Sequence, residues 1–74
     1  MASETLDCTG LQCPMPIVRL AKAAKSLSAG DSITVTADDP GFEPDIKAWA
    51  EAQGHELTSL SEEDSVFTAV ITLR

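Results

Sequence analysis

The segment Cys13-Pro14-Met15-Pro16 carries the residues best suited to chemistry in this chain. Pro14 fits the first position of a helix, where a missing N–H and a fixed φ are tolerated, and Pro16 still lies in the first turn. Cys13 is then expected at or near the N-cap, facing unpaired N–H groups and the positive end of the helix dipole. Because that environment favours the thiolate, we expect a reactive thiol rather than a buried apolar side chain.

Few other residues are candidates for a share in this chemistry. His55, the only histidine, follows Gly54 without a visible orienting partner, so we interpret it as a surface residue rather than a catalytic base. Two cysteines and one histidine are too few for a four-ligand structural zinc site, and the Cys8-x4-Cys13 spacing differs from the C-x-x-C redox motif. Neither a metal nor an organic cofactor is expected.

A single reactive thiol is sufficient for thiol–disulfide or thiol–persulfide exchange, because sulfur is both the attacking and the leaving atom. We therefore expect a protein that carries a sulfur atom as a persulfide on Cys13 and hands it on. Such a protein is a carrier more than a full enzyme.

Cys8 has two interpretations. It alternates with Leu6 in a strand-like segment, which predicts a thiol buried in the core for structural reasons. The alternative is a resolving cysteine, since the turn that follows could bring the Cα atoms of Cys8 and Cys13 within the disulfide limit of about 7 Å.

Composition narrows the class of partner. The net charge of −7 disfavours direct binding to nucleic acid, and no apolar run is long enough to span a membrane. The first residues lack the basic start and apolar stretch of a signal peptide, so we expect a cytoplasmic protein with reduced cysteines. Its partners are expected to be proteins.

The basic residues are unevenly distributed. Three of the five lysines and arginines, Arg19, Lys22 and Lys25, lie on the helix predicted to follow Cys13. Arg19 and Lys22 are one turn apart and should share a face. We expect partner proteins to dock there, with Met15 as an adaptable apolar contact.

The elements that position the thiol follow the order β-α-β-α-β-β. Strands are predicted over 5–8, 32–37, 55–60 and 66–73, helices from Pro14 to Leu27 or Ser28 and over 42–53, and a hairpin loop over 61–64. This order predicts an α+β two-layer sandwich, with a four-stranded mixed sheet and both helices on one face. Trp49 is expected in the core. The face opposite the helices is expected to carry Thr34, Thr36, Thr68 and Thr72.

The N-terminal segment also resembles a known family. The signature L-D-x-x-G-L-x-C-P-x-P of the TusA (SirA-like) sulfur carrier proteins is matched by Leu6-Asp7-Cys8-Thr9-Gly10-Leu11-Gln12-Cys13-Pro14-Met15-Pro16. The resemblance continues through Asp38-Asp39-Pro40, Asp45-Ile46, Trp49 and Gly54-His55-Glu56-Leu57. It implies a single sulfur carrier domain over 1–74, a fold similar to the C-terminal domain of translation initiation factor 3, and a persulfide on Cys13.

The resemblance implies partners as well. Family members take sulfur from cysteine desulfurases or rhodaneses and pass it to DsrE-type proteins, for tRNA thiolation, molybdenum cofactor supply or cytoplasmic sulfur oxidation. Cys8 with Thr9 and Gln12 looks more like the members tied to sulfur oxidation or persulfide handling. Supporting or docking roles would fall to Pro14, Met15, Pro16, Arg19 and Lys22 on what is expected to be a monomer.

Two other classes of function stay open. A regulatory module that binds without covalent chemistry would keep its function in Cys13→Ser. A thiol redox sensor would form a reversible disulfide between Cys8 and Cys13. A ubiquitin-like sulfur carrier would need a C-terminal Gly-Gly, whereas this chain ends Leu73-Arg74.

Overall fold

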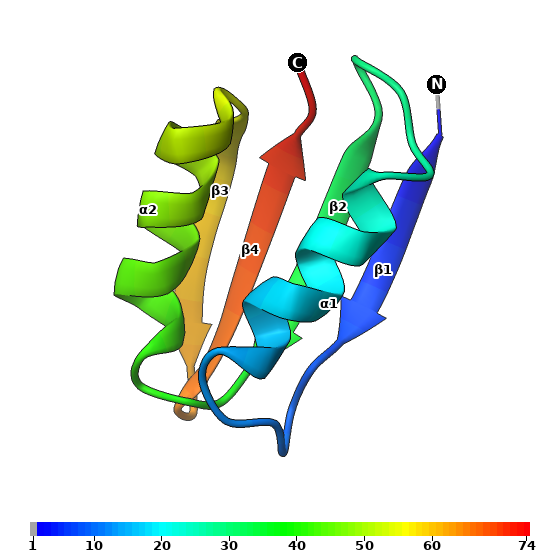
Figure 1. Cartoon of the computed structure of the whole chain (residues 1–74). Coiled ribbons are helices and arrows are strands. Elements are labelled where there is room, and N and C mark those ends of the chain that lie inside the picture. The colour runs from blue at the N-terminus through cyan, green and yellow to red at the C-terminus, as the bar shows by residue number, and fades with distance from the viewer. Residues whose placement is uncertain (1) are drawn as a thin grey trace.

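In the computed structural model, which describes residues 2–74, two helices lie against one face of a four-stranded mixed sheet (Figure 1). The fold class and the order of the elements are those predicted. In chain order the elements are β1 (Ser3–Asp7), α1 (Met15–Ala24), β2 (Ser32–Ala37), α2 (Phe42–Gln53), β3 (Glu56–Glu63) and β4 (Val66–Thr72).

The sheet has the strand order β1-β2-β4-β3. β1 and β2 run parallel, as the crossover through α1 requires, and β4 is antiparallel to both β2 and β3. Because β1 and β2 are parallel, their carboxyl ends meet at one end of the sheet. The segments that lead into α1 and α2 therefore leave the sheet side by side (Figure 1).

The core lies between the sheet and the helices. Strand alternation buries one face of β2 and β4, and the threonines of the other face are less buried, as predicted. The rings of Phe42 and Phe67 lie 6.1 Å apart between α2 and β4. The other large buried side chains that face one another across the two layers are Leu20, Ile33, Val35, Ile46 and Ile71.

The β3–β4 hairpin differs from the prediction. The predicted loop over 61–64 is wrong, because β3 continues to Glu63, which pairs with Val66. Asp64 and Ser65 form a two-residue turn with φ of 52° and 65°, the left-handed conformation that tight hairpins require. A register shift between Leu57 and Ser59 gives this strand its irregular apolar spacing.

Helix α1 ends a turn earlier than predicted, at Ala24 rather than Leu27 or Ser28. The next backbone N–H groups donate to carbonyls three residues back, including Lys25 to Lys22 at 3.3 Å, so the chain tightens and leaves the helix. β1 covers Ser3–Asp7 rather than 5–8. Neither helix of the described residues is long and apolar enough to cross a membrane.

Trp49 lies at the edge of the core rather than within it. Its side chain is half-buried, packs against the core cluster, and lies with its ring centre 5.3 Å from that of His55. The prediction of a core tryptophan is therefore right about the face of α2 and wrong about the depth.

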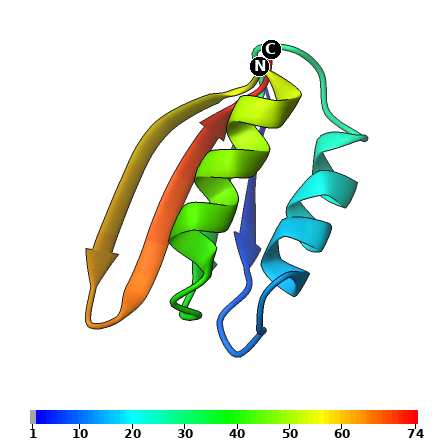
Figure 2. The ribbon, with the colours of Figure 1, turned by 60° about the vertical axis from the view of Figure 1, so that its left-hand side comes forward.

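The start of β1 and the end of β4 lie at the same end of the sheet, away from the start of α1 (Figures 1 and 2). Asp31, the buried carboxylate in the loop between α1 and β2, joins this region. Its side chain accepts hydrogen bonds from the Ala2 N–H at 3.0 Å and the Ser28 N–H at 2.8 Å. These donors hold the pKa of Asp31 below its ordinary value, with the Ser28 bond the larger cause.

Candidate functional site

Cys13 lies in the connection from β1 to α1, with its thiol side exposed to solvent. Pro14 is the N-cap of α1 rather than its first residue, and Pro16 follows Met15 within the first turn. Pro14 is exposed, whereas Pro16 is fully buried beneath the segment. The two prolines thus differ in role, because only Pro16 anchors the start of the helix in the core.

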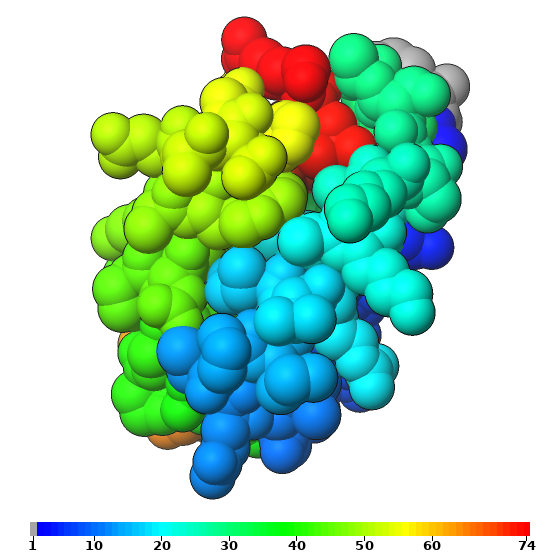
Figure 3. Space-filling model, viewed as in Figure 1, coloured from blue at the N-terminus to red at the C-terminus, as the bar shows by residue number. Residues whose placement is uncertain are grey.

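Two aspartates from the β2–α2 connection fix the cysteine segment. Asp38 Oδ1 accepts the Gly10 N–H at 3.0 Å, and Asp39 Oδ2 accepts the Cys13 N–H at 3.1 Å. The space-filling view shows the segment before α1, in blue, against the start of α2, in green (Figure 3). These contacts follow from the parallel strands, which bring both connections to the same end of the sheet.

The Cys13 thiol itself donates a hydrogen bond to Asp45 Oδ2, in the first turn of α2. Gly41 permits the close approach of this turn. A Cβ at Gly41 would lie 3.5 Å from Cys13 Cβ, 3.7 Å from Cys13 Sγ and 3.1 Å from Asp39 Oδ2. The site therefore consists of the thiol, two carboxylates and a glycine that leaves room for them.

The surroundings of Cys13 work against the expected thiolate. The hydrogen bond to Asp45 raises the pKa of the Cys13 thiol, as do partial desolvation and the negative charges of Asp45 and Asp39. The helix start offers little compensation. Pro14 and Pro16 have no N–H, and the Met15 N–H already donates to the Gln12 carbonyl at 2.8 Å. These contacts thus favour the thiol form of Cys13 over the thiolate.

Cys8 is fully buried in the core cluster, which confirms the prediction made from strand alternation. Burial raises the pKa of its thiol, and the nearby Arg19 charge partly offsets that effect. Cys8 and Cys13 are both free thiols in the described residues.

A groove of about 700 Å³ runs between the exposed side of α1 and β1. Arg19 and Lys22 both line it, so they share a face as expected, whereas Lys25 lies at a separate hollow beside Trp49. Met15 and Val18 line the same groove and are 44% and 50% exposed. The groove thus combines the two positive charges and the negative charge of Glu4 with exposed apolar side chains, next to the segment that carries Cys13.

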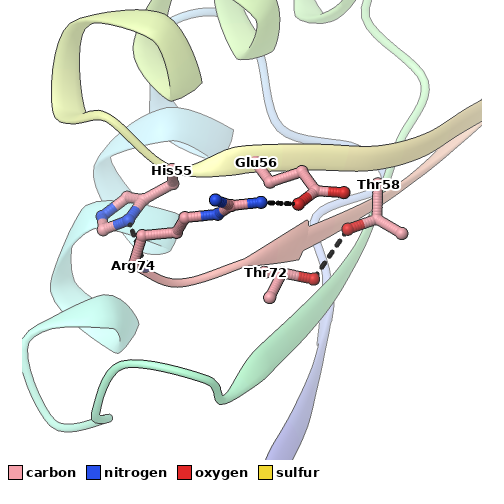
Figure 4. A network of polar contacts seen from close by, with 5 residues as sticks. All are labelled: His55, Glu56, Thr58, Thr72 and Arg74. Atoms are coloured by element: carbon pink, nitrogen blue, oxygen red, sulfur yellow. Dashed lines mark hydrogen bonds and ion pairs between the residues drawn. The ribbon is translucent and has the colours of Figure 1, made fainter.

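His55 lies far from the thiol. Cys13 meets the first turn of α2 and His55 follows its last turn, so a 12-residue helix of about 18 Å separates them. His55 Nδ1 accepts the Arg74 N–H at 3.0 Å, and the Arg74 guanidinium pairs with Glu56 (Figure 4). Beside them, the hydroxyls of Thr58 and Thr72 are 2.7 Å apart. These contacts tie β3 to the C-terminal end of the chain.

Cys13 was predicted from the sequence as the reactive residue, whereas its partners Asp39, Gly41 and Asp45 were not. The signal was present, because Asp38-Asp39-Pro40-Gly41 follows β2 and Asp45 follows it by one helical turn. A parallel pair β1–β2 places that segment beside the segment after β1. Asp39 and Asp45 were part of the family resemblance, but the sequence pattern gave neither of them a role beside Cys13.

Known proteins that resemble this chain carry names that refer to sulfur transfer. The family model described as "Sulfurtransferase TusA" matches residues 4–73. A Neisseria meningitidis protein provisionally named a sulfur carrier is 49% identical over 71 residues, 96% of each chain. The sulfur carrier protein TusA of Allochromatium vinosum is 40% identical over 68 residues, covering 92% of this chain and 90% of that protein.

A solved structure shows the same fold. The crystal structure of a SirA-like protein from Desulfitobacterium hafniense superposes with a TM-score of 0.84 at 31% sequence identity. The match covers 93% of this chain and 95% of that one.

Proposed function

Since the chain belongs to the TusA family of sulfur carrier proteins, we propose that Cys13 accepts sulfane sulfur as a persulfide and passes it to a partner protein. The observation that carries this proposal is the exposed thiol of Cys13 at the start of α1, fixed by Asp39 and Asp45 at a surface that a protein partner can reach.

The reaction needs only sulfur chemistry. Cys13 releases its thiol proton to solvent and, as the thiolate, attacks the outer sulfur of a donor persulfide. An S–S bond forms on Cys13, the donor S–S bond breaks, and the donor leaves as a thiolate. The same exchange in the reverse sense discharges the sulfur to an acceptor thiol. Electrons balance in both steps without a separate oxidant or reductant.

The proposed partners are a cysteine desulfurase or rhodanese as donor and a DsrE-type protein as acceptor, in a relay for sulfur oxidation or tRNA thiolation. We place the exchange in a reducing compartment, the cytoplasm, where a free thiol persists. The chain would act as a monomer that docks through the groove between α1 and β1, because Met15, two residues after Cys13, lines that groove.

The burial of Cys8 counts against the alternative of a redox sensor. A disulfide with Cys13 would require the fully buried Cys8 side chain to leave the core. A sensor mechanism would therefore include partial unfolding, whereas the persulfide mechanism uses a thiol that is already exposed.

Mass spectrometry of the intact protein tests the proposal. After incubation with a cysteine desulfurase and cysteine, or with a rhodanese and thiosulfate, the wild-type chain should gain one sulfur that a reductant removes. Cys13→Ser should gain none, while Cys8→Ser, the matched control, should load like wild type. Equal loading of the Cys13→Ser chain would overturn the assignment of the persulfide to Cys13.

A further inference from the structure

The contact between Cys13 and Asp45 distinguishes the empty carrier from the loaded one. In the empty protein the thiol hydrogen is donated to Asp45 Oδ2. In a persulfide that hydrogen has been replaced by sulfur, so Cys13 Sγ has nothing to donate. A hydropersulfide is a stronger acid than a thiol, so the terminal sulfur carries a negative charge near neutral pH, and a nearby carboxylate repels it.

We propose that Asp45, with Asp39 beside it, biases Cys13 towards discharge, by stabilising the empty thiol and repelling the loaded persulfide. This inference rests on the persulfide role proposed above. The two carboxylates oppose the formation of a thiolate, so they would only hinder a site whose sole task was nucleophilic attack. The proposed bias gives them a function.

The geometry keeps both carboxylates next to the sulfur. Asp39 is held by the Cys13 N–H at 3.1 Å, and Asp45 lies in the first turn of α2. Gly41 lies between them, leaving too little space for a side chain without displacing Asp39. The negative charges of Asp45 and Asp39 both act on the Cys13 thiol and raise its pKa.

The discharge step is balanced. An acceptor thiolate attacks the terminal sulfur of the Cys13 persulfide, an S–S bond forms on the acceptor, and the S–S bond on Cys13 breaks. The electron pair of that bond remains on Cys13 Sγ, which takes up one proton from solvent. The restored thiol then donates its hydrogen bond to Asp45 again.

Sulfur exchange between two copies of the chain measures this bias. Wild type, Asp45→Asn and Glu51→Gln are loaded with inorganic polysulfide, freed of excess reagent and each equilibrated near neutral pH with an equal amount of empty, nitrogen-15-labelled wild type, and the loaded-to-empty ratio of the unlabelled chain is read by intact mass. Asn keeps the size of the side chain and removes its charge, so the ratio should rise about five- to tenfold. Glu51→Gln removes one charge from the exposed far end of α2 and should leave the ratio unchanged. An unchanged ratio in Asp45→Asn would overturn the inference while leaving the persulfide on Cys13 intact.

Alkylation of the empty chain tests, without any sulfur loading, whether Asp45 stabilises the thiol form of Cys13. The rate with iodoacetamide, an uncharged reagent, is followed against pH for wild type, Asp45→Asn and Asp45→Ala. Both variants should react faster near neutral pH, with midpoints shifted to lower pH, because the thiol loses its carboxylate partner. Circular dichroism confirms the fold of each variant. Superimposable profiles would show that Asp45 does not hold the thiol, whether or not the wild-type chain carries a persulfide.

Discussion

At the scale of single residues, Cys13 and Cys8 are chemically alike and differ in their surroundings. Cys13 is exposed between two carboxylates, whereas Cys8 is sealed in the core beneath α1. The first can meet a partner protein, and the second contributes packing. Sequence alternation predicted the burial of Cys8. The contact between Cys13 and Asp45 was missed, because it joins residues 32 positions apart and depends on the parallel pairing of β1 with β2.

Substitution of Cys8 should lower stability and spare sulfur loading. Cys8→Ala removes a buried sulfur and should cost about 1–2 kcal/mol of unfolding free energy. Cys8→Ser buries a hydroxyl among apolar side chains and should cost more, about 1–3 kcal/mol beyond the change to Ala. Urea denaturation ranks wild type, Cys8→Ala and Cys8→Ser by their free energy of unfolding, and intact mass gives the sulfur loading of Cys13. If either variant kept its fold and lost sulfur transfer, Cys8 would be a resolving cysteine.

At the scale of elements, boundaries with strong local signals were predictable. β2 and α2 begin and end where the sequence predicts, because Asp38-Asp39-Pro40-Gly41 separates them and Gly54, with φ of 74°, ends the helix. The limits of β3 were not predictable in the same way. Its register shift places Leu57 and Leu60 opposite Ile71 and Ala69 of β4, and such a shift has no simple alternating pattern.

The β1–α1 and β2–α2 connections meet closely at the site because Gly41 has no side chain. The backbone conformation of Gly41 does not itself require glycine. Its φ of −74° suits any residue, but an added Cβ would lie 3.1 Å from Asp39 Oδ2. Gly41→Ala should therefore loosen the hold of Asp39 on the Cys13 N–H and alter the alkylation rate of Cys13, with a change in stability below about 1 kcal/mol.

Gly54→Ala provides the opposite control for Gly41→Ala. Gly54 has open space around it but a φ of 74°, so alanine at this position should cost about 1–2 kcal/mol of stability and leave the reactivity of Cys13 as in wild type. Thermal unfolding and iodoacetamide kinetics on both variants separate the two effects. The same response from both would contradict a specific contact at Gly41.

At the scale of the whole molecule, the two ends of the sheet have separate tasks. The end where β1 and β2 terminate carries Cys13, and the opposite end gathers the chain termini around Asp31, His55 and Arg74 (Figure 1). Stability can thus be altered at one end without direct contact with the reactive sulfur at the other.

Asp31 should make stability depend on pH at that distant end. Its pKa is lowered in the folded chain below the ordinary value of 3.8, so its contribution is present above that value and is lost as the pH falls through the folded pKa. Asp31→Asn should lower the melting temperature near neutral pH, and the difference from wild type should shrink in acid. Glu51→Gln, on an exposed helix face, is the control. A constant difference at every pH would mean that the charge of Asp31 is not what the Ser28 and Ala2 N–H groups stabilise.

The distribution of charge over the whole molecule predicts how partners approach. The chain has a net charge of −7, yet Arg19 and Lys22 line the groove beside the cysteine segment. An acidic partner surface would be drawn to this groove and repelled elsewhere, an effect mainly on association rate.

Lys22→Glu should therefore slow sulfur transfer from a desulfurase, and Arg19→Glu with Lys22→Glu should slow it further. Lys25→Glu makes the same change just after α1, outside the groove, and should have a smaller effect. Stopped-flow transfer at several salt concentrations measures this, since salt screens exposed charges beyond about 10 Å at 0.1 M. Wild-type transfer should slow as salt rises, the double variant should respond little, and equal rates for Lys22→Glu and Lys25→Glu at low salt would rule out docking through the groove.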